Sequence, residues 1–418
     1  MTGNVDVTEA VAQAHRREWA RVLAATVRVV RDLDLAEECV QDAYTQALRK
    51  WTVSGVPARP GAWLTSVARN RAKDLLRRES VLRSALPLLV TDDIVTGPED
   101  RAGPQAVGDD RLRLIFTCCH PTLSRDAQVA LTLRLVCGLS TTEVARAFLV
   151  QDTAMAARIT RAKGKISGAR IPYRMPDPAD LPRRVDSVLD VVHLVFTTGH
   201  VTPVGNQLVR RDLVDGALHL ARTLHQLLPG NTDVGGLLAL LLLTDARRDT
   251  RISEDGALVL LADQDRRRWD AQQIEEGTAL VTQSLRRTGP TRYSVQAAIA
   301  AVHAEAATWE DTDWVEIVGL YEVLRRLWPS AVVDLNWAIA IGFRDGPEAG
   351  LAALAPLLDE PALGTHAYLS AARADFLRRL GRWPESALSY EEALTMTDNE
   401  VERAFLLRRR EEVALHLD

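Results

Sequence analysis

Basic side chains gather in one stretch of the sequence, between Arg69 and Arg83, where six basic residues stand against two acidic ones. Four of them, together with an amide and an indole, form a first candidate set: Trp63, Arg69, Asn70, Lys73, Arg77 and Arg78. Cations at four-residue spacing share one face of a helix and can hold phosphates. The Asn70 amide and the Trp63 ring could contact unpaired bases by hydrogen bonding or stacking. A tryptophan that opens an amphipathic helix is more often a core residue, so Asn70 and the arginines are the stronger candidates.

A second candidate set lies in a helix-turn-helix pattern. Gly138 ends one predicted helix, residues 140–143 are typical of the start of the next, and a turn around residues 149–152 leads to a basic helix. In such a motif the second helix enters the major groove with its N-terminal end toward the bases. The residues expected to face bases are Thr153, Ala154, Ala157 and Arg158, and those expected to bind phosphates are Arg161, Lys163 and Lys165.

A third candidate set is acidic. It begins with the last residue of an Asp-Leu-Asp turn that supplies a helix N-cap, and it consists of four carboxylates and one amide: Asp34, Glu37, Glu38, Gln41 and Asp42. Such a run suits a basic protein partner. An isolated acidic run is more often a solvated helix face, so this set gains weight only from its neighbours.

Two further clusters do not add up to a site. Cys118, Cys119 and His120 are consecutive, and their side chains would diverge on a helix, whereas zinc needs four converging ligands. The charged segment Asp255–Asp270 is better explained as a solvated turn than as an acidic site. We find no phosphate-binding loop, nucleophile motif or carboxylate pair. The sequence therefore predicts no metal, no cofactor and no catalytic residue, and an enzyme is the least favoured class.

Composition places the chain among soluble proteins. It has 418 residues, of which 47% are hydrophobic and 26% charged, and the apolar run Gly235–Leu243 is too short to span a membrane. Four cysteines in so long a chain predict no disulfide framework and a cytoplasmic location. The net charge of −5 hides an asymmetry: residues 1–170 hold 25 basic and 19 acidic residues, a net of +6, which leaves −11 for the remainder. The two parts are therefore expected to have separate roles.

Helical periodicity without convincing strands predicts an all-α chain. Residues 8–83 form a first helical domain and residues 84–110 an acidic linker rich in proline and glycine. Residues 111–170 form a second helical domain, and four prolines between 172 and 182 mark a boundary before a helical extension, residues 183–418.

The three candidate sets stand in the order and spacing of a known family. The stretch DLAEECVQDAYTQALRKW resembles the polymerase-binding region of extracytoplasmic-function sigma factors, and PGAWLTSVARNRAKDLLRRES resembles their promoter-melting and −10-reading region. The helix-turn-helix resembles their −35-reading domain. One such match would be weak evidence, but three in series are strong.

The resemblance implies two small helical sigma domains, region two and region four, that bind core RNA polymerase and promoter DNA. The acidic set would meet the β′ clamp helices, region four would meet the β flap, and no membrane is involved. The alternative is a helix-turn-helix regulator with a helical-repeat sensor. It accounts for residues 110–418 and leaves residues 10–80 without a role.

The extension carries an internal repeat. Trp314 and Tyr321 recur 69 residues later as Trp383 and Tyr390, about two tetratricopeptide periods of 34 residues. We therefore expect tetratricopeptide-like helical pairs from about residue 310, with the repeated aromatic residues packed between helices. The extension resembles that of a sigma factor subgroup in which it controls activity in place of, or beside, an anti-sigma protein. A protein partner for the extension is expected.

Overall fold

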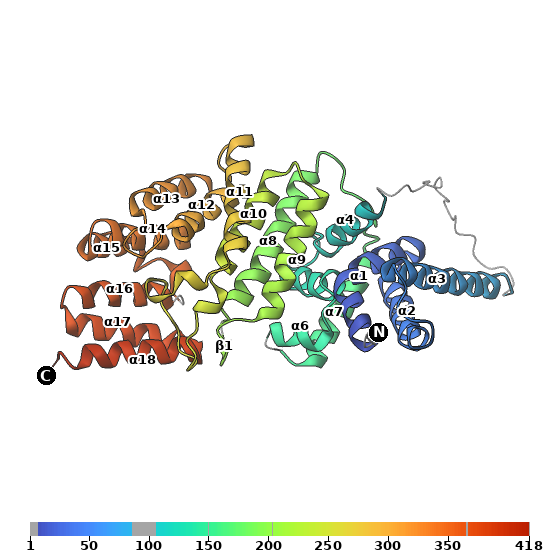
Figure 1. Ribbon diagram of the computed structural model, residues 1–418, viewed down its shortest axis with the longest axis horizontal. Helices are drawn as coiled ribbons and strands as arrows, with labels where there is room; N and C mark the ends of the chain where they lie inside the picture. The colour runs from blue at the N-terminus through green and yellow to red at the C-terminus, as the bar shows by residue number, and fades with distance from the viewer. Residues whose placement is uncertain (1–6, 86–105, 149, 203, 365–366, 418) are drawn as a thin grey trace, which may run out of the picture. The chain divides into compact units, whose positions relative to one another are not determined.

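The computed structural model describes residues 7–85, 106–148, 150–202, 204–364 and 367–417. Helices make up nearly all of the regular structure in these residues, as predicted (Figure 1). The one parallel strand pairing among them joins β1 (Val204–Gly205) to β2 (Asp398–Asn399). The chain divides into two compact units, Met1–Val192 and His193–Asp418. None of the described helices is both long and apolar enough to cross a membrane.

The first unit begins with three helices that pack on one another: α1 (Val7–Val30), α2 (Leu33–Ser54) and α3 (Pro60–Ala85). Apolar residues at helical spacing on α1, including Trp19, Leu23 and Val27, are buried. The Asp32 side chain accepts a hydrogen bond from the Leu35 amide at 2.8 Å, which confirms the predicted N-cap of α2.

Among the described residues, the remainder of the first unit contains five helices and one π-helical turn, Thr132–Val136. The helices are α4 (Ala106–Cys118), α5 (Arg125–Leu131), α6 (Thr141–Ala147), α7 (Asp152–Gly168) and the first part of α8 (Leu181–His200). Ser140 and Glu143 form a reciprocal capping box at the start of α6, as the sequence predicts. Helix α7 packs against α5 and α6.

The linker and the proline-rich boundary differ from expectation. Helix α3 continues to Ala85 and α4 begins at Ala106, inside the range expected for the linker, and residues 86–105 lie outside the described residues. The proline-containing stretch packs on the helices before it through Tyr173. The division falls within α8. The N-terminal half of α8 also packs on the first unit, since Arg125 pairs with Asp190 at 2.8 Å.

The second unit is a succession of helices, each packed on its neighbours in sequence. After α8 come α9 (Arg211–Leu227), α10 (Thr232–Asp245), α11 (Ala271–Thr288), α12 (Arg292–Glu305), α13 (Trp314–Leu327), α14 (Ala331–Arg344), α15 (Pro347–Leu354), α16 (Ala367–Arg379), α17 (Trp383–Thr395) and α18 (Glu400–Ala414). The four repeated aromatic residues pack into hydrophobic clusters, two between α12, α13 and α14 and two between α16, α17 and α18. Their predicted structural role is confirmed.

The charged segment Asp255–Asp270 is only partly the solvated turn that the sequence suggests. Asp265 and Arg267 pair at 2.9 Å on the surface, and 90% of the Arg267 side chain is exposed. Arg266, by contrast, donates to the carbonyl oxygens of His303 and Ala306 at 2.6 and 2.7 Å. Arg266 therefore links this segment by hydrogen bonds to the C-terminal end of α12.

Two glycines in the second unit make room for one buried aromatic ring. A methyl group on Gly342 of α14 or Gly350 of α15 would overlap the ring of Phe376, which is 1% exposed. Cores are packed too densely to absorb such an overlap without moving a neighbour.

We expect Gly342→Ala to lower the free energy of unfolding by roughly 1–3 kcal/mol, because the added methyl group displaces Phe376. Gly319→Ala is the matched control, since Gly319 lies within α13 and a methyl group there meets no atom within 4 Å. That variant should gain up to about 1 kcal/mol from helix propensity. Urea unfolding measures both, and equal effects of the two variants would contradict the packing argument.

Candidate nucleic-acid interface

The basic side chains predicted on α3 are exposed. Arg69, Asn70 and Lys73 lie on the solvent-facing side of the helix, while Leu64, Ala68 and Ala72 are buried against α1 and α2. Arg77 and Arg78 are exposed one turn further on. The helix thus presents a continuous row of cations and one amide to solvent.

Trp63 has a mixed role. Its ring is half-buried and meets the fully buried ring of Trp51 edge to face, with centroids 5.6 Å apart. This contact supports the core explanation that the sequence favoured for this residue. The part of the ring that stays exposed lies at the start of the same helix as Asn70.

Helix α7 buries one face and exposes the other. Met155, Ile159, Ala162 and Ile166 recur at helical spacing and are buried. The residues predicted to face bases at the N-terminal end, Thr153, Ala154 and Ala157, are exposed. Arg158 lies half-buried beside them, with its guanidinium 5.2 Å from the centre of the Phe148 ring and 3.5 Å from a carboxylate oxygen of Asp126. These contacts hold Arg158 in place next to the exposed face.

The acidic set on α2 is divided between the surface and the interior. Asp34, Glu38 and Gln41 are exposed, and Asp42 pairs with Arg71 of α3 at 2.9 Å. Glu37, in contrast, is buried, with 7% of its side chain exposed. In this structure Glu37 therefore does not belong to the surface that the sequence assigned to it.

Glu37 lies in an ion cluster that joins α2 to α7 and to the π-helical turn. One carboxylate oxygen contacts the Lys163 amine of α7, and the other is 2.8 Å from the Arg134 guanidinium in the π-helical turn. Lys163 also contacts Asp34, at 2.7 Å, and only 10% of its side chain is exposed. Two carboxylates and two cations thus neutralise one another where α2 meets α7.

The surroundings of Lys163 act on its charge in opposite directions. Burial lowers the pKa of the ammonium, but attraction and hydrogen bonding to Glu37 and Asp34 outweigh it, so the pKa of Lys163 is raised. A raised pKa in the folded state stabilises the fold while the group is protonated. This contribution is therefore complete at neutral pH and is lost only as the pH rises beyond the usual lysine value of 10.5.

Other contacts reinforce the same packing. The Trp19 indole donates to the Leu135 carbonyl at 3.1 Å. The Tyr173 hydroxyl lies 3.1 Å from the Ala24 carbonyl and 2.9 Å from that of Asp110, so its single proton is shared between α1 and α4. Burial raises the pKa of Tyr173 well above its usual value, and the hydroxyl stays protonated as a donor.

The contacts between these helices include residues that the sequence reasoning missed. Arg134 and Tyr173 belong to none of the three candidate sets. Arg134 contacts Glu37, and Tyr173 bridges α1 and α4. Arg134 gave a weak signal, as a charged residue inside an apolar run. Lys163, predicted to bind phosphate, is instead held by two members of the predicted polymerase-binding set. While this contact lasts, its amine is not available to a phosphate.

The cysteines near α4 are core residues. Cys118 and Cys119 are fully buried, and the Cys119 sulfur lies 3.4 Å from the Thr132 hydroxyl. Burial raises the pKa of Cys119 to about 11, which keeps the thiol protonated at neutral pH. Within the described ranges, no group of three or more His, Cys, Asp and Glu side chains could hold a metal ion.

Comparisons with known proteins agree with the geometry. Residues 14–81 match the family model for sigma-70 region 2, residues 113–166 match that for sigma-70 region 4, and residues 184–285 match a family of unknown function, DUF6596. The chain is 42% identical over 390 residues to uncharacterized protein R00370 of Rhizobium meliloti (strain 1021), and the match covers 92% of each chain. No solved structure was found to match.

We expect Glu37→Gln to weaken the packing of α7 on α2 by roughly 3–5 kcal/mol, because it leaves buried cations without their carboxylate. Hydrogen exchange of the α7 amides, followed by mass spectrometry, should show the faster opening. Glu38→Gln is the matched control, since Glu38 is the exposed neighbour on the same helix. Identical exchange in the two variants would show that the ion cluster does not hold the two parts together.

Proposed function

Because the chain belongs to the extracytoplasmic-function sigma factors of the sigma-70 family, with a helical extension after region 4, we propose that it directs core RNA polymerase to a particular set of promoters and that the extension regulates this activity. A role in promoter recognition follows from the two sigma regions themselves. The choice of particular promoters and the regulation by the extension are our proposal. The chain would act by stoichiometric binding.

The observation that carries this proposal is the exposure of both predicted DNA-contacting faces. The α3 row of Arg69, Asn70 and Lys73 faces solvent, and so does the N-terminal end of α7 around Thr153 and Ala157. The first would bind and melt the −10 element, and the second would contact the −35 element in the major groove. A stand-alone helix-turn-helix regulator would have no use for residues 14–81, which match region 2.

Polymerase binding is assigned to the exposed part of the acidic set. Asp34, Glu38 and Gln41 lie on one side of α2 and suit a basic coiled coil, such as the clamp helices of the β′ subunit. Region 4 would contact the β flap. Asp42 would support this surface from its pair with Arg71.

The ion cluster suggests that the compact first unit is the resting form. Lys163 could bind a DNA phosphate only after its contact with Asp34 has broken. Asp34 could likewise bind polymerase only after that contact has broken. The proposed sequence of events is therefore that region 2 separates from region 4 when polymerase and promoter offer new partners of the same charges. The Lys163–Asp34 contact at 2.7 Å supports this order.

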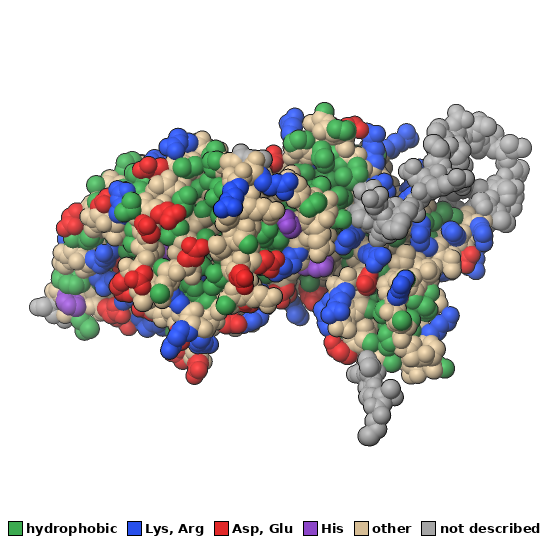
Figure 2. All heavy atoms as spheres, turned by 45° about the horizontal axis from the view of Figure 1, so that its top comes forward, with side chains coloured by type: hydrophobic (Ala, Val, Ile, Leu, Met, Phe, Trp, Pro, Cys, Tyr) green, Lys and Arg blue, Asp and Glu red, His purple; other side chains and the backbone are tan. Residues whose placement is uncertain are grey.

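The extension is proposed as a regulatory surface. Figure 2 shows carboxylates spread over the second unit, in keeping with the net charge of −11 after residue 170. Stacked helical pairs commonly offer an extended surface to a protein partner. Simple attraction to the basic part is insufficient for control, since exposed charges are screened beyond about 10 Å at 0.1 M salt. A specific docking surface is therefore required.

Run-off transcription with core polymerase tests this proposal. The full chain should give promoter-specific transcripts, and a chain ending at Val192 should change their yield severalfold while still binding polymerase. The cut follows Val192 because a cut at residue 183 would remove the buried α8 residues Val185, Val188 and Leu189. Absence of any promoter-specific transcript would refute the sigma role, and equal yields from both chains at all promoters tried would refute regulation by the extension.

Charge reversal on α2 tests polymerase binding separately. Asp34→Lys with Glu38→Lys should abolish co-purification with core polymerase, because both side chains would repel a basic partner. Exchange of Glu411 and Glu412 for lysine, on α18, serves as the control of equal charge. Unchanged co-purification of the α2 variant, with unchanged helicity by circular dichroism, would remove polymerase binding from this surface.

Substitutions on α7 separate base reading from phosphate binding. Arg158→Ala should cost about 1–3 kcal/mol and relax the preference at one −35 position. Lys165→Ala should weaken all promoters evenly and lower the slope of the salt dependence by about one. Competition binding to promoter variants, as the polymerase holoenzyme, measures both. If Arg158→Ala weakened every promoter equally, Arg158 would position the backbone instead.

A further inference from the structure

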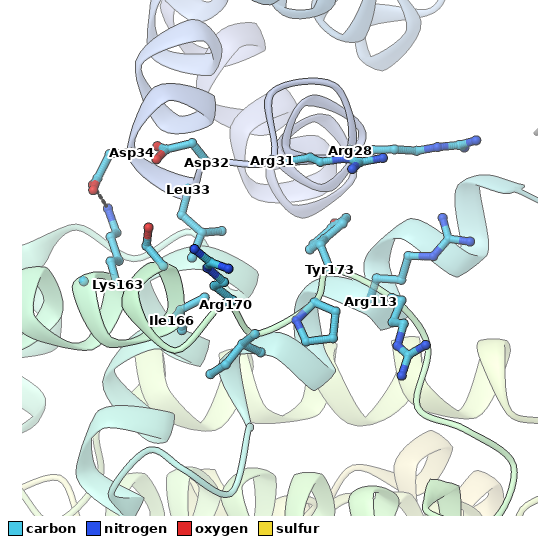
Figure 3. A pocket seen from close by; sticks show the side chains of 15 residues that line it. Arg28, Arg31, Asp32, Leu33, Asp34, Arg113, Lys163, Ile166, Arg170 and Tyr173 are labelled. Carbon is cyan, nitrogen blue, oxygen red and sulfur yellow. Dashed lines mark hydrogen bonds and ion pairs between the residues drawn. The ribbon is translucent and has the colours of Figure 1, made fainter. Parts of the chain in front are cut away.

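A basic cavity of about 870 Å³ lies in the first unit where α1, α2, α4 and α7 meet the segment that follows α7. Its lining includes six cations, Arg28, Arg31, Arg113, Lys163, Arg170 and Arg174, against two carboxylates, Asp32 and Asp34 (Figure 3). Apolar and backbone groups from Leu33, Ile166 and residues 171–173 complete the lining. No role proposed so far uses this cavity.

Most of the cations already have an anionic partner. Arg28 and Arg113 lie 3.7 and 2.6 Å from the buried Asp110 carboxylate, Lys163 is held by Asp34, and Arg174 pairs with Asp177. The two that remain are Arg31 and Arg170. Neither guanidinium makes an ion pair or a hydrogen bond with any described residue, although both line the same cavity.

The backbone singles out the same two arginines. Arg31 and Arg170 have φ angles of 55° and 50°, and they are the two non-glycine residues with positive φ in the described part of the chain. They follow the C-termini of α1 and α7, positions where glycine is relaxed and a residue with a side chain is strained. The negative end of a helix dipole offsets part of this strain when the side chain is a cation. Strain that persists at such positions is often tied to function.

We propose that this cavity binds a small polyphosphate, such as the phosphate tail of a nucleotide, between Arg31 and Arg170. Guanidinium groups bind phosphate oxygens in a bidentate manner, and two of them without partners can hold more than one phosphate. The volume lies in the range of about 300–1,000 Å³ typical of small-molecule sites. A concave site of this size admits a chain of phosphates, whereas a DNA duplex, as a rigid rod, would meet only its rim.

The place of the site means that a bound ligand would affect the opening of the first unit, and this effect rests on the proposed function. Arg31 follows a region 2 helix and Arg170 follows the region 4 recognition helix, so a ligand held by both binds the compact form of the first unit. A ligand that binds only this form, at one hundred times its dissociation constant, favours that form about a hundredfold. A small polyphosphate would therefore oppose the separation of regions 2 and 4 that polymerase binding requires.

Calorimetric titration of the full chain with inorganic triphosphate, and separately with ATP, tests the site itself. Triphosphate should bind with one site per chain, and sulfate at equal ionic strength should not replace it. The decisive variant is Arg31→Gly with Arg170→Gly, because glycine removes both guanidinium groups while relaxing the backbone. We expect at least tenfold weaker triphosphate binding with no loss of thermal stability.

The matched control is Arg286→Ala with Arg326→Ala, two exposed arginines on α11 and α13, which should leave binding unchanged. Equal triphosphate binding by the glycine variant and the unaltered chain, or no binding by the unaltered chain, would overturn the site. An equal loss of promoter affinity in the glycine variant, measured as holoenzyme without triphosphate, would also overturn it, because the arginines would then be contacts for the DNA backbone.

Co-purification with core polymerase tests the consequence. Saturating triphosphate should reduce recovery of the unaltered chain severalfold and leave the glycine variant unaffected. Undiminished recovery of the unaltered chain would refute the link to separation of the two regions, even if triphosphate binds. Failure of the sigma role itself would show differently, as absence of promoter-specific transcripts without any triphosphate present.

Discussion

A carboxylate that leaves water must find cations to replace its hydration, and the arrangement of the first unit depends on how Glu37 meets this requirement. Its two oxygens contact Lys163 and Arg134, which come from separate elements of region 4. Without both cations the desolvation of the carboxylate would cost several kcal/mol. Glu37 can therefore be buried only when region 4 supplies its cations to region 2. The packing of α2 on α7 and the burial of the Glu37 side chain therefore depend on each other.

Charged contacts also lower the cost of opening this packing. When an ion pair opens in water, each member recovers hydration that it lost on burial, so the net cost of opening is far below the energy of the contact. Arg28 and Arg113 around Asp110 repeat the arrangement of Glu37 at a second place. There, burial raises the pKa of the Asp110 carboxyl, although the two arginines act in the opposite direction. Both carboxylates would therefore recover hydration on leaving these surroundings.

The features of the structure that can be predicted from the sequence are those that depend on interactions between residues close to one another in the chain. The N-cap at Asp32, the capping box of Ser140 with Glu143 and the repeated aromatic residues of the extension each depend on neighbours one or two helical turns away. An acidic run, in contrast, has the same pattern whether it faces solvent, polymerase or a lysine of the same chain. The contact of Glu37 with Lys163 therefore could not be read from either stretch. Tyr173 could not be singled out because it stands among prolines, which are typical of a boundary, although its hydroxyl contacts the carbonyls of Ala24 and Asp110.

The separation of Glu37 and Lys163 along the chain also has a consequence in time. The two residues are 126 positions apart, so at about 5–20 residues per second the ribosome delivers Lys163 roughly 6–25 s after Glu37. The helices of region 2 can form well within that interval. For those seconds a nascent chain carries the acidic surface of α2 with no internal partner for it. A polymerase molecule near the ribosome would meet region 2 in its open form before the chain was able to close it.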